Sequence, residues 1–243
     1  QKISANEFGK IDYSKIPSLA AARYQKLFNR KDGERYKAYI ESLSKGETKI
    51  NAGAVYPYDV IKSVKYGNAD VANEQWKALP NWMAEGESIL CMSDVSSSMS
   101  WVNFGSITAL DIGVSLALYV AERNTGCFKN ELMVYSTNPH FIELSGDLRN
   151  RHRQVMRHVE YGSTNLQAAF DRILETGKRN NLTQKDMPSK LIIFSDMEFN
   201  QVDGANGRTN FEAIQSKYKK AGYEMPQLVF WYLANRNGTC EVS

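Results

Sequence analysis

The residues best suited to do chemistry lie in one short segment, Asp94-Val-Ser96-Ser-Ser98. The Asp94 carboxylate is followed two and four positions later by the hydroxyls of Ser96 and Ser98, so a tight loop turns three oxygens toward one point. Hard cations such as Mg²⁺ need oxygen ligands in near-octahedral geometry and usually keep some of their waters. The segment therefore predicts one side of a divalent-cation site.

Two distant segments offer the remaining oxygen ligands. Gly162-Ser-Thr164-Asn165 is a loop of small residues that opens a helix, and Ser195-Asp196 closes an apolar run. The predicted metal ligands are Asp94, Ser96, Ser98, Thr164 and Asp196. We expect Mg²⁺ at this site, and the residues leave Mn²⁺ and Ca²⁺ open as alternatives.

The segments around these ligands read as an α/β domain. Ser88–Asp94 and Lys190–Asp196 are short apolar runs that end in a carboxylate, and Gln227–Leu233 is a third apolar run. Buried parallel strands have this pattern and carry ligand-binding residues beyond their carboxyl ends. Ile107–Glu122 reads as an apolar helix packed on the sheet. We therefore predict a doubly wound, mostly parallel sheet with helices on both faces.

The other expected elements alternate in the same way. The strands are Glu131–Tyr135 and His140–Leu144, and the helices are Asp147–Val159, Leu166–Thr176 and Asn210–Lys220. By contrast, residues 1–86 show helical apolar spacing and no convincing β-alternation. The helices expected there are Ile16–Asn29, Glu34–Ser44, Pro57–Tyr66 and Ala69–Ala84. We predict a helical segment over residues 1–86 and an α/β domain over residues 87–243.

The Asp94 motif, the Thr164 loop and Asp196 together resemble the metal-ion-dependent adhesion site of von Willebrand factor A domains, which are Rossmann-like. The resemblance implies direct ligation by the two serines and often by Thr164, and contacts of the two aspartates through coordinated waters. It also implies that the sixth position takes a carboxylate from a partner. Ser97 stands where Gly is frequent in the intracellular version, which affects the loop but not the ligand set.

The resemblance extends to both sides of the motif. Ile11–Ser18, Ile50–Pro57 and Ser195–Phe199 are similar to an uncharacterised plant, fungal and viral family, which carries a domain of unknown function related to the Ro/TROVE RNA-binding proteins. In Ro proteins a ring of helical repeats binds structured RNAs and closes onto an A domain. The resemblance implies that residues 1–86 are the end of a TROVE-like helical region and that the A domain lacks its last elements.

Two further groups of residues suit binding partners. Arg149, Arg153 and Arg157 share one face of a helix and could contact phosphates, although a solvated helix face explains the same spacing. Trp101 and Phe104 follow the metal loop; if exposed they form an aromatic rim suited to a protein partner, and if buried they are packing.

Composition narrows the class of protein. The formal net charge of +3 permits a nucleic-acid partner without arguing for one. The three cysteines have no CxxC spacing, which disfavours a disulfide framework or a structural zinc site, and His140 and His152 have no acidic or Cys neighbours at ligand spacing. There is no apolar stretch of about 18 residues and no apolar signal-peptide core at the start, so we expect a cytoplasmic protein that does not enter a membrane.

These observations favour a non-catalytic module that binds an Asp or Glu carboxylate of a protein partner through the metal. The alternative is a Ro-like protein that binds structured RNA through basic helices. An enzyme is not expected: a haloacid-dehalogenase-type phosphatase would need a second carboxylate at Ser96 as its general acid, and a hydroxyl cannot do that job.

Overall fold

The computed structural model of the chain describes residues 2–50, 52, 55–66, 69–84, 86–135, 138–159, 165–196 and 207–233. The chain divides into two compact units, the first made of Gln1–Trp82 with Gly146–Asn150 and the second of Met83–Ser145 with Arg151–Ser243. None of the described helices combines the length and the apolar character that crossing a bilayer requires.

The first unit is helical, and its core is aromatic. Its elements are η1 (Phe8–Lys10), η2 (Tyr13–Lys15), α1 (Ser18–Lys31), α2 (Gly33–Ser44), α3 (Pro57–Tyr66) and α4 (Ala69–Lys77). One cluster in this unit consists of Phe8, Ile11, Tyr13, Phe28, Tyr36, Ile40, Leu43 and Val71. The Arg35 guanidinium donates hydrogen bonds to the carbonyl oxygens of Phe8 (3.0 Å) and Ile11 (2.8 Å) and so fixes the incoming chain against α2.

One helix of this unit is shorter than predicted. The apolar spacing predicted a helix over Ala69–Ala84, but α4 ends at Lys77. The next two residues close a turn, in which the Ala78 N–H bonds to the Glu74 carbonyl. Pro80 explains the early end, because it disfavours helical backbone in the preceding residue and has no N–H to continue the ladder.

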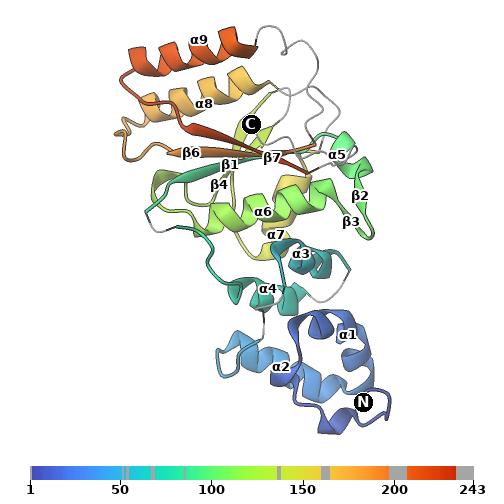
Figure 1. Cartoon of the computed structure of the whole chain (residues 1–243). Coiled ribbons are helices and arrows are strands. Elements are labelled where there is room, and N and C mark those ends of the chain that lie inside the picture. The colour runs from blue at the N-terminus through green and yellow to red at the C-terminus, as the bar shows by residue number, and fades with distance from the viewer. Residues whose placement is uncertain are drawn as a thin grey trace. The chain divides into compact units, whose positions relative to one another are not determined.

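The second unit is built on a mostly parallel sheet (Figure 1). Within the described residues its strand order is β5 (His140–Glu143), β4 (Glu131–Tyr135), β1 (Ile89–Asp94), β6 (Lys190–Ser195) and β7 (Gln227–Tyr232). The strands from β4 to β7 in this order run parallel to one another, and β5 at the edge runs antiparallel to β4. The predicted α/β fold class is confirmed.

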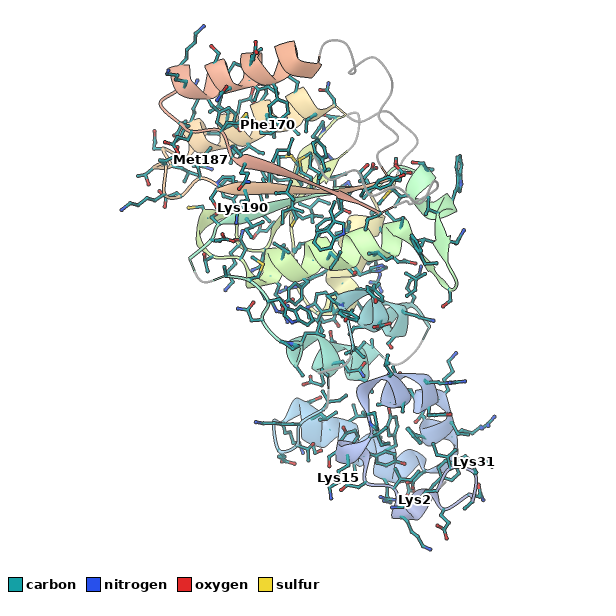
Figure 2. The ribbon with its side chains drawn as sticks, in the orientation of Figure 1. Lys2, Lys15, Lys31, Phe170, Met187 and Lys190 are labelled. Carbon is teal, nitrogen blue, oxygen red and sulfur yellow. The ribbon has the colours of Figure 1, made fainter. Side chains whose placement is uncertain are left out.

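Helices cover both faces of this sheet. α6 (Ala109–Arg123) packs on one face, whereas α8 (Leu166–Arg179) and α9 (Gly207–Lys220) cover the other, as Figure 1 shows. Phe170 and Met187 belong to the apolar cluster on the α8 and α9 side (Figure 2). Every residue of β1 is buried, as a central parallel strand covered on both faces requires.

The connection from β1 to α6 contains elements that were not predicted. It forms a short helix, α5 (Ser98–Trp101), and a small hairpin of β2 (Asn103–Phe104) and β3 (Ile107–Thr108). α6 then begins at Ala109, because Thr108 and Asp111 form a capping box in which each side chain accepts the backbone N–H of the other.

Gly113 lies in a close contact between α6 and the side of the sheet that contains β6. A Cβ atom at this position would lie 3.1 Å from Leu233 Cδ1 and 3.3 Å from both Met99 Cε and Phe194 Cβ. Glycine is unfavourable in a helix interior, so close packing explains its presence here. The absence of a side chain at Gly113 therefore allows α6 to pack closely against Met99 and β6.

Candidate metal centre

Adjacent parallel strands bring two carboxylates to one edge of the sheet. Asp94 is the last residue of β1, and Asp196 directly follows β6. The two strands pair along their length, with Ser93 opposite Phe194. Both aspartates are buried, each with 3% of its surface exposed.

Both oxygens of the Asp94 carboxylate are held by hydrogen bonds. The Ser96 backbone N–H donates to Oδ1 at 2.9 Å, and the Ser195 hydroxyl donates to Oδ2 at 2.7 Å. The first bond closes the turn after β1, and the second crosses from β6. These bonds fix the orientation of the carboxylate. The role of Ser195 was not predicted; its only signal in the sequence is that it precedes Asp196 on the neighbouring strand.

The hydroxyls of the loop converge as the spacing predicted. Ser96 Oγ and Ser98 Oγ lie 3.0 Å apart, and both residues are partly buried. Neighbouring ligands of an octahedral Mg²⁺, each about 2.0–2.1 Å from the ion, lie about 2.9 Å apart. The backbone N–H of fully buried Met99 bonds to the Ser96 carbonyl and anchors the loop to the core. The two hydroxyl oxygens therefore have the separation of adjacent ligands.

The electrostatics of the site favour a bound cation. Burial raises the pKa of the Asp94 carboxyl, and hydrogen bonds from Ser96 and Ser195 lower it, while the nearby Asp196 carboxylate raises it again. In the described part of the chain, no basic side chain forms a salt bridge with Asp94. A divalent cation between the two carboxylates would offset both their burial and their repulsion.

The described residues contain no alternative metal site made of three or more His, Cys, Asp or Glu side chains. The Asp94 edge contributes two residues of those types and otherwise serine hydroxyls. This hydroxyl-rich set fits Mg²⁺ and suits soft metals poorly.

Four of the five predicted ligands can be placed. Asp94, Ser96, Ser98 and Asp196 lie at the carboxyl edge of β1 and β6. Thr164 lies outside the described residues, as does the Gly162 loop. The helix that this loop precedes, α8, begins at Leu166, with the Asn165 side chain accepting the Ala168 N–H at 3.0 Å.

The aromatic residues after the metal loop are exposed. Trp101, the last residue of α5, has 67% of its surface accessible, and Phe104 on the hairpin has 48%. Of the two interpretations of these side chains, inward packing is therefore wrong.

The arginines of α7 (Leu148–Met156) and of the turn that follows it divide between two environments. Arg151 forms an ion pair with Glu122 at 3.0 Å and is largely buried. Arg149, Arg153 and Arg157 are exposed, and no salt bridge to any of them occurs among the described residues. The structure therefore leaves three guanidiniums open to solvent.

Comparisons with known proteins agree with this architecture. A family model described as "Domain of unknown function (DUF7788)" matches residues 88–243, and another, "Domain of unknown function (DUF2828)", matches residues 1–88. The chain is 28% identical over 254 residues to "Uncharacterized protein L728" of Acanthamoeba polyphaga mimivirus, in an alignment that covers 97% of this chain and 43% of that protein.

A solved structure shares the fold. The crystal structure of the Deinococcus radiodurans RO (RSR) protein aligns with a TM-score of 0.52 and 14% identity, over 92% of this chain and 47% of that one. The chain thus spans less than half the length of either protein. At this identity the likeness concerns the fold alone. Because the first model covers well over half of the sequence, the chain belongs to the DUF7788 family of domains of unknown function.

Proposed function

We propose that this chain is a metal-dependent protein-interaction module. A Mg²⁺-type ion at the Asp94 edge would accept an Asp or Glu carboxylate from a protein partner. The observation that supports the proposal is the placement of two buried carboxylates, Asp94 and Asp196, beside two hydroxyl oxygens that lie 3.0 Å apart.

Each residue has a distinct role in this proposal. Ser96 and Ser98 hold the ion directly, and Thr164 completes the set from its own loop. Asp94 and Asp196 supply negative charge and orient coordinated waters. Because neutral hydroxyls hold the ion, it keeps enough Lewis acidity to bind one more carboxylate. The exposed rings of Trp101 and Phe104 add apolar surface beside the motif, where aromatic anchors commonly contribute to affinity.

The proposed function is binding and not catalysis. The position of Ser96, two residues after the strand-terminal aspartate, holds a hydroxyl that cannot act as a general acid at neutral pH.

Isothermal calorimetry of Mg²⁺ binding tests the metal site. We expect the wild-type chain to bind one ion and Asp94→Ala and Ser98→Ala to lose that binding. Ser100→Ala is the matched control, because Ser100 lies two residues further along α5 and is equally half-exposed. Wild-type affinity in Asp94→Ala, with an unchanged circular dichroism spectrum, would contradict the proposal.

Affinity capture in Mg²⁺ and in chelator tests the partner. Proteins that bind wild type in Mg²⁺ should be lost with chelator and with Ser98→Ala but retained by Ser100→Ala. Trp101→Ala should weaken capture while leaving Mg²⁺ affinity unchanged. Partners that bind equally in chelator would refute metal-dependent recognition.

A second candidate function is binding of structured RNA. The observation that favours it is the exposure of Arg149, Arg153 and Arg157, which contrasts with the paired Arg151. Each phosphate contact releases counterions, so affinity should fall steeply with salt. Replacing all three arginines by Glu should abolish a gel shift at low salt, whereas Arg179→Glu at the end of α8 should not. No shift by the wild type at low salt would end this alternative.

A further inference from the structure

Two histidines meet at β5, two strands across the sheet from β1. His140 is the first residue of β5, and His158 follows α7. His140 Nε2 lies 3.0 Å from His158 Nδ1, and the ring centroids are 4.7 Å apart with an angle of 57° between the planes. Both side chains are half-exposed, so water and ions reach them.

The second nitrogen of His140 determines which atom carries its lone pair. His140 Nδ1 lies 2.9 Å from the carbonyl oxygen of Asn138. A carbonyl only accepts hydrogen bonds, so Nδ1 carries the proton, and the lone pair of the neutral ring is on Nε2, facing His158. Metal-binding histidines are commonly oriented in this way, by donating the other ring N–H to a carbonyl.

The separation of the two nitrogens fits a shared metal ion. Two imidazole ligands of a tetrahedral Zn²⁺, each about 2.0–2.1 Å from the ion, have nitrogens about 3.3 Å apart. The observed 3.0 Å is a hydrogen-bond distance that needs only a small opening of the rings. Replacement of the hydrogen bond by a metal therefore requires both rings to turn until their lone pairs point at the ion, a movement that half-exposed side chains can make.

We propose that His140 and His158 form a nitrogen-donor site for a borderline transition-metal ion of the Zn²⁺ or Cu²⁺ class. The ion takes the lone pairs of His140 Nε2 and His158 Nδ1, and the neutral His158 ring changes tautomer through solvent, losing its proton at Nδ1 and gaining one at Nε2. Water or a ligand from a partner fills the remaining positions. The spacing of the histidines along the chain did not predict this pair, because the residues are 18 positions apart.

This site differs in chemistry from the Asp94 edge and stands independently of the proposed function. Imidazole nitrogens favour Zn²⁺ and Cu²⁺, whereas hydroxyl and carboxylate oxygens favour Mg²⁺. The strands also separate them: His140 pairs with Val134 of β4, and Val134 pairs with Ser93 of β1. The two sites should therefore load independently.

Cu²⁺ electron paramagnetic resonance and Zn²⁺ calorimetry test the proposal on untagged protein, because a purification tag would add histidines. Cys127 and Cys240 are replaced by Ser to remove competing thiols. We expect one bound Zn²⁺ that excess Mg²⁺ does not displace, and hyperfine splitting from two nitrogens with Cu²⁺. His140→Gln and His158→Gln should each weaken Zn²⁺ binding at least tenfold and reduce the splitting to one nitrogen.

Asp94→Ala is the matched control and should bind Zn²⁺ like the wild type. Circular dichroism of each His variant shows whether the fold survives. Unchanged Zn²⁺ affinity in both folded His variants, or Cu²⁺ spectra without nitrogen splitting, would overturn the proposal. Loss of Zn²⁺ binding in Asp94→Ala would also overturn it, because the ion would then occupy the oxygen site.

Discussion

The polar side chains at the amino ends of β1 and β6 are paired with partners of suitable charge or hydrogen-bonding type, whereas those at the carboxyl ends bring like charges together. At the amino ends, the Asn124 side chain accepts the Ile89 N–H at 3.0 Å and donates to the Ile89 carbonyl at 2.8 Å. Lys190, which is labelled in Figure 2, forms an ion pair with Glu87. At the carboxyl ends, Asp94 and Asp196 are buried close enough for their charges to repel.

This difference separates groups that stabilise the fold from groups that serve a ligand. The Asn124 side chain and the Glu87–Lys190 pair at the amino edge bind protein partners, and removal of either should therefore destabilise the fold. The carboxyl edge buries two carboxylates whose charges repel, at a cost in stability. We expect a cation to reverse that cost.

Asn124→Ala should be the most destabilising change. It removes the partners of both backbone groups of Ile89 inside the core, since Asn124 is only 1% exposed. Because the N–H and the carbonyl of Ile89 are then buried without partners, we expect the free energy of unfolding to fall by about 2–4 kcal/mol. Urea denaturation in chelator measures it, with the exposed Asn180→Ala as control. The affinity for Mg²⁺ should not change, and a parallel loss of it would break the contrast between the two edges.

Mg²⁺ should stabilise the wild-type chain by mass action. At a free concentration about 100 times the dissociation constant, the expected gain is about 2.7 kcal/mol. Thermal unfolding with and without Mg²⁺ measures it. Ser96→Ala should lose most of the gain and Ser100→Ala should keep it, because only the first removes a proposed ligand. If Mg²⁺ stabilised Ser96→Ala and Ser100→Ala equally, the ion would not bind at Ser96.

Asp94→Asn should stabilise the chain when divalent ions are absent. Burial raises the pKa of this carboxyl, so the folded state holds its proton more tightly than the unfolded state. The wild type therefore loses stability as pH rises from the ordinary carboxyl range through the raised pKa, and the full penalty is present at neutral pH. The neutral amide avoids that penalty, for a gain of about 1 kcal/mol at pH 7.

Which of the two proteins is more stable, the wild type or Asp94→Asn, should depend on the pH and on Mg²⁺. The advantage of Asp94→Asn should shrink as pH falls, because the wild-type carboxyl then takes up its proton. In saturating Mg²⁺ the wild type should become the more stable protein. Urea midpoints across pH, with and without the ion, measure both effects. A variant less stable than the wild type at neutral pH in chelator would show that Asp94 stabilises the fold by itself.

Much of the sheet edge follows from local sequence. A strand that ends in a carboxylate can be recognised because a buried parallel strand contains a continuous apolar run, as Ile89–Met92 of β1 and Leu191–Phe194 of β6 do. The convergence of Ser96 and Ser98 follows from their spacing in one short turn. The exposure of Trp101 did not follow, because a loop leaves the direction of a side chain open.

Other features depend on contacts between distant segments. The bond from Ser195 to Asp94 joins residues 101 positions apart and exists only because β6 pairs with β1. The hairpin of β2 and β3 has two residues in each strand, which is too short for any periodicity to show. The pairing of His140 with His158 likewise depends on the antiparallel return of β5. The participation of Thr164 in the metal site stays a prediction.

Glu87→Gln should have the smallest effect, and it tests how far pairing at the amino edge stabilises the fold. The Glu87–Lys190 side chains are each 33% exposed, so solvent screens their attraction. Partly exposed ion pairs contribute about 0–1 kcal/mol, and we expect a loss of about 0.5 kcal/mol that disappears at high salt. Urea midpoints at low and high salt measure it. Since Glu87 lies at the opposite ends of the strands from Asp94, Mg²⁺ affinity should be unaffected; a loss that persists at high salt would mean that the pair acts through packing and not through charge.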